Sequence, residues 1–467
     1  MKNILLMKYI HLFKTNSEFT TAYNGPDYIE PWLSLTEETM TIGSNKPKLT
    51  DFSAEPLTFN ILSAGTINWK ARSTSITKTI DYKLNDGEWT SITSNTGSSA
   101  PTITVNSGDK LQFRGNNEQY CTGVSSYNSF GDSTALFEVE GNIMSLIYGD
   151  DFKNNLTISS DYTFANLFKD CTKLVSAENL ILPATTLTST CYASMFQGCT
   201  SLTTAPALPA TTLASTCYDY MFGSCKNLTT APELPATTLA SKCYSSMFEG
   251  CTSLTTAPEL PATKLESSCY QSMFQGCTSL TTAPALPATT LASSCYNVMF
   301  RNCTSLTTAP ELPATTLASK CYSNMFKGCK KLTAAPELPA TKVASDCYFE
   351  MFNGCTALTT APSVLPATNL ATSYGCYNSM FKGCTSLTTA PELPATKLES
   401  SCYTRMFEGC TSLNYIKCLA TNISAYNCTG NWVSGVASTG TFVKASSMKS
   451  WTRDVNGIPA NWTVQNA

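Results

Sequence analysis

Apolar side chains recur along much of this chain at a fixed interval of 26 residues. In one representative unit, Cys243, Tyr244, Met247, Phe248 and Cys251 fall at positions i, i+1, i+4, i+5 and i+8. This spacing puts five apolar side chains on one helical face, so it predicts a short helix over residues 243–251 whose stripe points inward. The leading cysteine of the unit recurs at Cys191, Cys217, Cys243, Cys269, Cys295, Cys321 and Cys347, and then at Cys376 and Cys402.

The second half of each unit has a different pattern. Residues 254–257, Leu-Thr-Thr-Ala, form a short β-tolerant run that Pro258 closes. Pro258 and Pro261 lack backbone donors, which predicts an extended, irregular return through Leu265. Because one such unit is too small to bury its own apolar face, consecutive units must stack. We therefore predict an α/β repeat solenoid whose coils each contain a strand, an extended return and a short helix.

The units resemble the BspA-type leucine-rich repeats of bacterial surface proteins, whose core has the pattern Met-Phe-x-x-Cys-x-x-Leu. Here the pattern runs from Met247 to Leu254, and its copies extend from about residue 156 to about residue 413. The resemblance implies a leucine-rich-repeat-like, curved stack of parallel strands with short helices outside, used for adhesion and recognition. Proteins of this kind are encoded by phages of gut bacteria and by the bacteria themselves.

Between residues 49 and 148 the apolar period changes to two, which is typical of β-strands. The turn Asn85-Asp86-Gly87 favours a hairpin, because these residue types tolerate positive φ. We expect a small antiparallel β-sandwich domain ahead of the solenoid, used as a spacer or anchor, with carbohydrate binding as the alternative. The seven predicted strands are residues 57–61, 66–69, 80–84, 89–92, 103–105, 111–113 and 136–139.

The two ends of the chain lack the repeat. Residues 1–48 are interpreted as a leader or docking segment, and their opening is similar to the start of many proteins encoded by phages of gut bacteria. Lys8 interrupts a brief apolar run, His11 and Lys14 follow, and no small-residue cleavage site appears, so no signal peptide is predicted. The solenoid is assigned to residues 149–413, and residues 414–467 to a C-terminal cap.

Charge limits the partners that this chain can bind. Charged residues make up 13% of the sequence, about half the usual ~25%, and the formal net charge is −3. Nucleic acids and anionic membranes are bound by concentrated positive charge, and the sequence has no cluster of Lys and Arg. No stretch approaches the ~18 consecutive apolar residues of a membrane span. We therefore expect neither a nucleic-acid partner nor membrane insertion.

Nineteen of the 22 cysteines lie in the repeats. The two cysteines of one unit are eight residues apart, about 12 Å on a helix, which is too far for a disulfide within the unit. They are predicted to form two ladders of buried thiols that pack as small apolar side chains, with bridges between adjacent units as the alternative. A bridge between Cys418 and Cys428 is predicted in the tail.

Residues for chemistry are scarce. The single histidine, His11, lies in the leader, so no Ser-His-Asp or Cys-His arrangement can be drawn within the repeats. The repeat cysteines lack the Cys-x-x-Cys spacing of zinc sites, and no nucleotide-binding signature is present. We predict a non-enzyme without a metal or cofactor.

The variable positions of the repeats are the first candidate binding surface. The two residues after each Cys-Tyr differ from unit to unit, whereas the Leu-Thr-Thr-Ala-Pro run hardly changes. Tyr220, Phe349 and Arg405 are the strongest candidates, because exposed aromatic residues and Arg commonly anchor interfaces. The alternative is that these are unconstrained solvent positions. Val364 together with Tyr374-Gly375 stretches one interval to 29 residues, which predicts a protruding loop.

Two other surfaces compete with this one. Thr255, Thr281, Thr307 and their equivalents should form a flat, uncharged ladder with a spacing of about 4.8 Å, which could meet a repetitive glycan or be inert. In the tail, Trp451 belongs to a set of three tryptophans that either cover the last repeat or line a sugar site.

Two functions remain open. The first is a recognition or adhesion protein on a phage particle or bacterial surface, whose solenoid binds a host-surface glycan or protein and whose N-terminal region contacts other virion or surface proteins. The second is a structural virion component whose solenoid packs only against other particle proteins.

Overall fold

The computed structural model describes residues 51–467, except residues 124, 371–373 and 450. The chain divides into two units, Met1–Asp51 and Phe52–Ala467. The leader predicted for residues 1–48, with His11, lies outside the described residues. In the part of the chain that is described, no helix is both long and apolar enough to cross a membrane.

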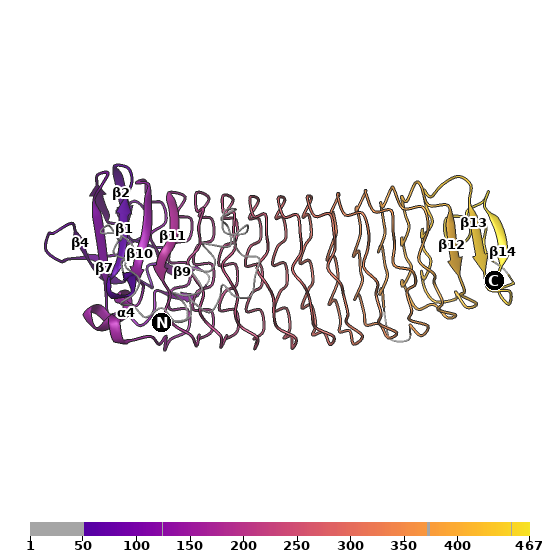
Figure 1. Cartoon of the computed structure of the whole chain (residues 1–467), viewed down its shortest axis with the longest axis horizontal. Helices are drawn as coiled ribbons and strands as arrows, with labels where there is room; N and C mark the ends of the chain where they lie inside the picture. Colours follow the sequence, from indigo (N-terminus) through magenta and orange to yellow (C-terminus); the bar gives the residue numbers. More distant parts are fainter. Residues whose placement is uncertain (1–50, 124, 371–373, 450) are drawn as a thin grey trace, which may run out of the picture. The chain divides into compact units, whose positions relative to one another are not determined.

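The unit Phe52–Ala467 begins with short strands (Figure 1). The strands are β1 (Leu57–Ile61), β2 (Gly65–Asn68), β3 (Lys70–Ala71), β4 (Thr79–Leu84), β5 (Thr90–Thr93), β6 (Thr102–Val105), β7 (Lys110–Arg114), β8 (Cys121–Gly123), β9 (Ser126–Ser129), β10 (Phe137–Asn142) and β11 (Leu174–Ile181). The short helices are the 3₁₀-helices η2 (Phe52–Ala54), η3 (Gly97–Ser99) and η4 (Gly149–Asn154), and the α-helix α4 (Ser145–Tyr148). Each predicted strand overlaps an observed one, whereas β3, β8 and β9 were not predicted.

These strands form one large sheet and two small ones. The large sheet has the order β11-β10-β1-β7-β4-β5, with antiparallel pairing from β10 to β5. The small sheets are β2-β6 and β3-β9-β8. The predicted hairpin turn joins β4 to β5, with Asn85 at a φ of 52°. The core is aromatic: the ring of Phe59 lies 4.8 Å from the rings of both Phe113 and Phe137.

The part of the chain that contains strands β1 to β10, here called the β-region, continues directly into the repeats. Strand β11, which belongs to the first coil, pairs in parallel with β10. Phe168 lies 5.7 Å from Phe130, and Phe164 stacks on Tyr120 of the β-region at 6.4 Å. The first repeat, which has Thr163 in place of the leading cysteine, therefore packs against the β-region on one side and against the second repeat on the other.

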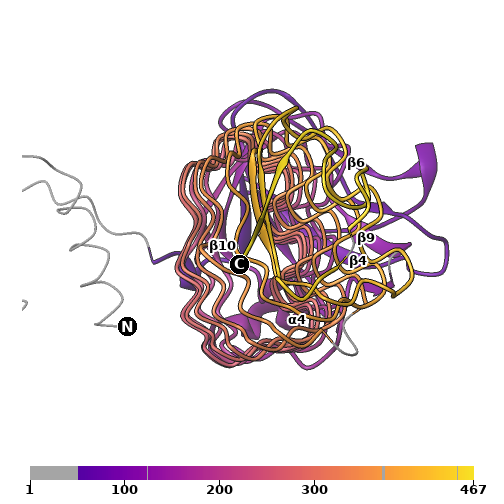
Figure 2. The ribbon, with the colours of Figure 1, turned by 90° about the vertical axis from the view of Figure 1, so that its right-hand side faces the viewer.

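In the coils that the structure describes, the predicted outer helices are absent. Residues 243–251 and their equivalents form a succession of tight turns, and the described coils nest one behind another when viewed along the stack (Figure 2). Within one coil, Met247 N–H donates to the carbonyl of Tyr244, whereas Phe248 N–H donates to the carbonyl of Met273 in the next coil at 2.9 Å. Alternate backbone donors thus bond within the coil and between coils.

Backbone geometry explains why turns replace the helix. Lys242, Ser246 and Gly250 have φ values of 56°, 50° and 73°, so every fourth residue is left-handed. This is the conformation required at the third position of a type II turn, and it interrupts a right-handed helix. A helix would use every donor within its own segment, whereas the turns keep half of them to bond the neighbouring coil. The prediction of a helix was therefore wrong.

In regular coils such as that of Thr256, the predicted strand is reduced to a single bridging residue. Thr256 forms isolated parallel bridges with Thr230 and Thr282 in the adjacent coils. A second row of parallel bridges joins Thr212, Thr238 and Lys264. The nearby Pro258 has no N–H to donate, which limits the length of regular pairing. Val364, one of the inserted residues, bridges to Glu392 in the next coil.

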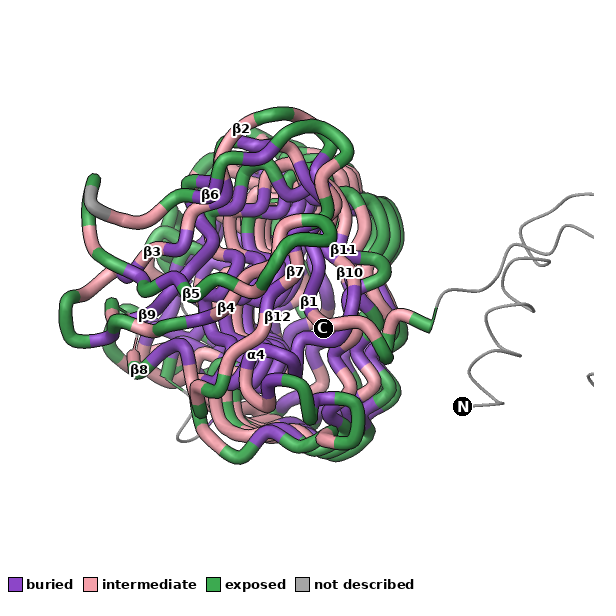
Figure 3. Tube along the Cα trace, turned by 90° about the vertical axis from the view of Figure 1, so that its left-hand side faces the viewer, coloured by how far each residue is buried: buried purple, intermediate pink, exposed green. Residues whose placement is uncertain are grey.

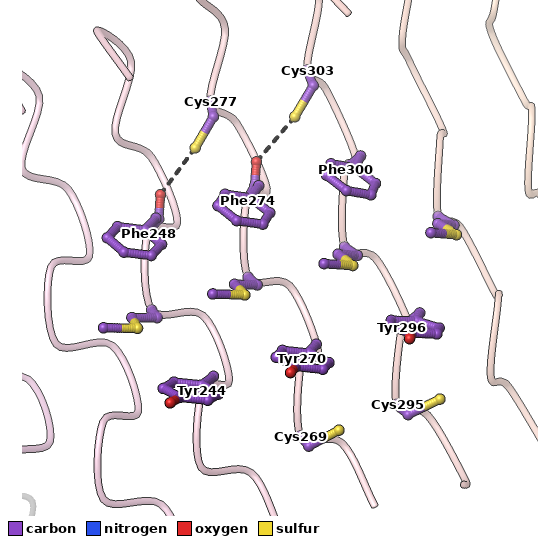
Figure 4. Packing of buried hydrophobic residues seen from close by; sticks show 14 of the residues in the cluster. Tyr244, Phe248, Cys269, Tyr270, Phe274, Cys277, Cys295, Tyr296, Phe300 and Cys303 are labelled. Atoms are coloured by element: carbon purple, nitrogen blue, oxygen red, sulfur yellow. Dashed lines mark hydrogen bonds between the residues drawn. The ribbon is translucent and has the colours of Figure 1, made fainter. Parts of the chain in front are cut away.

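The apolar positions form continuous ladders through the solenoid. Figure 4 shows Tyr244, Tyr270 and Tyr296 in register in three consecutive coils, with Phe248 and its equivalents in a second, parallel row. Consecutive rings are nearly parallel, and those of Tyr244 and Tyr270 are 5.8 Å apart. The leading cysteines and the Met-Phe-Cys residues of these coils are fully buried. Figure 3 shows that buried residues occupy the interior and exposed residues the periphery.

The second cysteine of each repeat has a specific partner. The Cys277 thiol donates to the carbonyl of Phe248 in the preceding coil at 3.1 Å, and Cys303 does the same with Phe274 (Figure 4). All 22 cysteines are free thiols. The predicted disulfide between Cys418 and Cys428 is therefore not formed in this structure, and the two ladders of buried thiols are observed.

The last coils are covered by a parallel sheet and a group of tryptophans. The sheet consists of β12 (Tyr415–Cys418), β13 (Thr441–Lys444) and β14 (Thr463–Asn466). Trp432 stacks on Tyr403 of the last regular coil at 6.2 Å, and Trp451 stacks on Trp432 at 5.7 Å. These rings continue the aromatic ladder beyond its last regular coil.

Candidate functional site

The residues that follow Cys-Tyr in successive coils lie next to one another along one edge of the stack. The backbone holds them there: Glu350 N–H donates to the carbonyl of Asn378 at 2.9 Å, and Arg405 N–H donates to the carbonyl of Gly430 at 2.8 Å. Because each coil repeats the same turns, the variable pairs of neighbouring repeats form a continuous row.

At the C-terminal part of this row the surface forms an open groove of about 360 Å³, here called the repeat groove. It brings together two of the predicted site residues, Phe349 and Arg405. Tyr374, from the insertion, contributes another wall, and 59% of its surface is exposed. The loop predicted there includes residues 371–373, which lie outside the described residues. The groove is lined by Phe349, Glu350, Tyr374, Asn378, Ser379, Ser401, Thr404, Arg405, Asn427, Gly430 and Asn431.

Ion pairs set the charge of the repeat groove. Glu350 is paired with Lys327 and accepts a hydrogen bond of 3.0 Å from Asn353 Nδ2, so its charge is balanced. On the other side, Glu408 interacts with Lys382 at 3.1 Å and with Arg405 Nε at 3.5 Å. One carboxylate thus faces two cations. The side chain of Arg405 is 54% exposed, and its positive charge is available to a ligand.

Tyr220 lies elsewhere in the solenoid. It is half-buried and is not among the residues that line the repeat groove. Burial raises the pKa of its phenol group. The three residues selected from the variable pairs therefore do not form one site.

Asp219, the neighbour of Tyr220, makes the stability of the folded protein depend on pH. Burial raises the pKa of Asp219 to about 6, against the opposing effects of a hydrogen bond from Ser245 and the charge of Lys242. The unfolded chain has a lower pKa, near 3.9, so the native state binds the proton more tightly. The stabilisation from protonated Asp219 is therefore complete below about pH 4 and is lost as the pH rises through about 6.

We expect Asp219→Asn to be about 1–3 kcal/mol more stable than the parent protein at pH 7.5, because it removes a buried charge. It should also abolish part of the decline in stability between about pH 4 and pH 6. Urea unfolding at several pH values measures both effects. Asp86→Asn, in an exposed turn, is the control and should keep the parent's pH profile. If the free energies of unfolding of Asp219→Asn and the parent protein changed with pH in parallel, the raised pKa of Asp219 would be contradicted.

The threonine ladder forms a separate exposed face. Both threonines of the pair are exposed in the coils of Thr255, Thr281 and Thr307, a point that the sequence left open. The second row of bridges, at Thr212, Thr238 and their equivalents, is exposed as well and was not predicted. Both rows lie outside the residues that line the repeat groove.

Trp451, the remaining predicted site residue, is buried. Only 9% of its surface is exposed, and its ring lies against Trp432 and Phe442. Its position is that of a covering residue at the end of the core.

Groups that could perform chemistry do not cluster in the described part of the chain. There, no three His, Cys, Asp or Glu side chains are placed to hold a metal ion. Burial raises the pKa of the Cys243 thiol to about 12 and that of Cys251 well above its usual value. Since the thiolate is the reactive form, these cysteines are poor nucleophiles.

Stacked coils with a common buried ladder define a repeat solenoid. Residues 151–281 and 192–333 match the model of the BspA type leucine-rich repeat region, in six copies. These residues are therefore BspA-type leucine-rich repeats. No curated protein gives a significant match to the chain.

Sequence reasoning missed most of the polar residues of the repeat groove. Tyr374 was recognised as part of an insertion but not as a wall of a site. Asn427 and Asn431 lie beyond the last regular repeat, where the register is harder to follow. The variable pairs were the available signal, because stacking places their members side by side.

Proposed function

We propose that this protein is a non-enzymatic recognition or adhesion protein exposed on a phage particle or bacterial surface, and that its solenoid binds a host-surface glycan or protein. BspA-type repeats are consistent with a surface or adhesion role, and leucine-rich repeats are generally binding modules. In this proposal the N-terminal region contacts other proteins of the particle or surface.

The proposal depends on one observation: the two residues after each Cys-Tyr vary from repeat to repeat, whereas the buried ladder beside them does not. The variable pair is Ala193-Ser194 in one repeat and Phe349-Glu350 in another, yet Tyr192 and Tyr348 are each 1% exposed. The members of these pairs range from buried, as at Ala193, to exposed, as at Arg405, and they change while the ladder stays the same. This is the property needed in a frame that displays different binding residues at a few exposed positions.

Binding of the labelled full chain to a panel of bacterial strains and epithelial cell lines tests the proposal. We expect saturable binding to at least one surface, and an excess of unlabelled chain should compete with it. The alternative, a structural virion component, predicts no cell binding and a fixed copy number in purified particles. The absence of saturable binding across the panel would contradict the recognition function.

A further inference from the structure

We propose that the repeat groove is a saccharide-binding site in which Arg405 binds a carboxylate of the glycan. This inference rests on the proposed recognition function and adds the location of the site and the chemical class of its ligand.

The polar lining of the groove matches the chemistry of sugars. Asn378, Asn427 and Asn431 provide amide groups, and Ser401 and Thr404 provide hydroxyls. An amide carries both donors and an acceptor, and a hydroxyl can act as either. Sugar hydroxyls also donate and accept, so a ring with several hydroxyls can satisfy these groups together. Thr404 Oγ1 already donates to the carbonyl of Asn427, and Asn378 Oδ1 accepts from Ser379 Oγ, but a purely apolar ligand would offer nothing to the remaining donors and acceptors, which costs free energy.

Two aromatic side chains complement the polar groups. Phe349 and Tyr374 both line the groove, and Tyr374 is more than half exposed. The C–H faces of a pyranose ring are apolar and flat, and they pack well on such rings. A volume of about 360 Å³ falls at the lower end of small-molecule sites, which run from ~300 to ~1,000 Å³, and suits a short glycan end.

The ion pairs at the groove favour an acidic sugar. Glu350 is matched by Lys327, whereas Glu408 is shared between Lys382 and Arg405, so these five groups carry one excess positive charge. Arg405 is also the more exposed of the two cations that flank Glu408. A guanidinium group binds carboxylates with paired, charge-assisted hydrogen bonds. A uronic or sialic acid would place its carboxylate there.

The floor of the groove is held by the inter-coil backbone bonds. Ser379 N–H donates to the carbonyl of Thr404 at 2.8 Å, and Ser401 N–H donates to the carbonyl of Tyr426 at 3.0 Å. Because these bonds continue the regular ladder, the lining groups are already positioned before a ligand arrives. Preorganisation of this kind lowers the cost of ordering the site on binding.

The test is a printed panel of oligosaccharides with uronic or sialic acids, each paired with its neutral counterpart and probed with the full chain. We expect binding to acidic members and weaker binding to their neutral counterparts. With the best binder, calorimetry should show at least about a tenfold loss of affinity for Phe349→Ala and for Arg405→Gln. Arg301→Gln and Gln271→Ala, at repeat positions outside the groove, are the matched controls and should bind normally.

Cell binding separates failure of this inference from failure of the recognition function. If labelled chain binds cells, mild periodate oxidation of the cell glycans should abolish that binding, and Phe349→Ala should weaken it. Binding that survives periodate, is lost after protease treatment of the cells and is unchanged by Phe349→Ala would overturn the saccharide site while leaving recognition intact. Equal affinity of Arg405→Gln and the parent for acidic glycans would also overturn it.

Discussion

Phe274→Ala is expected to lower the free energy of unfolding by about 3–5 kcal/mol, the usual cost of removing a fully buried phenyl ring. The Phe274 ring has no exposed surface and stacks between Phe248 at 5.7 Å and Phe300 at 5.6 Å. The truncation would open a cavity at the centre of the ladder.

The same substitution should also change how the protein unfolds. Coils of a solenoid interact mainly with their neighbours, so a weak coil in the middle uncouples the two halves. The described tryptophans lie in the β-region and in the C-terminal cap, so their fluorescence reports the ends, whereas circular dichroism reports the whole stack. We expect the two denaturation curves of Phe274→Ala to separate. Phe274→Leu, which keeps most of the side-chain volume, is the control and should have a smaller effect. A decrease in the free energy of unfolding of less than about 1 kcal/mol for Phe274→Ala would show that the stacked rings do not stabilise the solenoid.

Trp432→Ala is expected to cost about 3–5 kcal/mol at the C-terminal end. Trp432 is fully buried, stacks on Tyr403 and Trp451, and donates from Nε1 to the carbonyl of Gly457 at 2.8 Å. Without it, the last regular coil would lose its cover and become accessible to solvent. The loss should be local, because the N-terminal coils do not contact the cap.

Hydrogen exchange followed by mass spectrometry measures this effect. In Trp432→Ala, peptides covering residues 402–413 should exchange much faster than in the parent, while those covering residues 191–228 should not change. Trp89→Ala, in the half-exposed part of the β-region, is the control and should leave residues 402–413 protected. Unchanged protection of residues 402–413 in Trp432→Ala would show that the tryptophans do not stabilise the end of the stack.

The repeat period predicted the core because buried positions follow directly from it. Cys243, Tyr244, Met247 and Phe248 are buried together with all their equivalents, whatever the backbone between them does. The helix was wrong because the apolar pairs recur every four residues, which fits successive four-residue turns better than a helix of 3.6 residues per turn. A single unit does not reveal that alternate donors bond the next coil, since that pairing depends on stacking.

The candidate site was only partly predictable for a related reason. Stacking converts residues 26–29 apart into neighbours, so Phe349 and Arg405, which lie two coils apart, line one groove. Tyr220 belongs to coils too far away to join them. The parallel bridges lie at Thr256 and Thr282, one residue after the predicted Thr255 and Thr281, and both threonines of each pair are exposed because regular pairing is too short to alternate their faces. For Trp451 the sequence favoured a cover of the last repeat over a sugar site, and its ring is buried against Trp432 and Phe442.

The reactivity of the cysteines tests most directly whether the repeats share one sealed apolar interior. Under reducing conditions, native protein and protein unfolded in guanidinium are treated with iodoacetamide, and the modified residues are counted by mass spectrometry. Because burial raises the thiol pKa values and excludes the reagent, Cys171–Cys410 should stay unmodified in the native protein and react fully when unfolded. Labelling of the repeat cysteines at similar rates in both states would contradict the account.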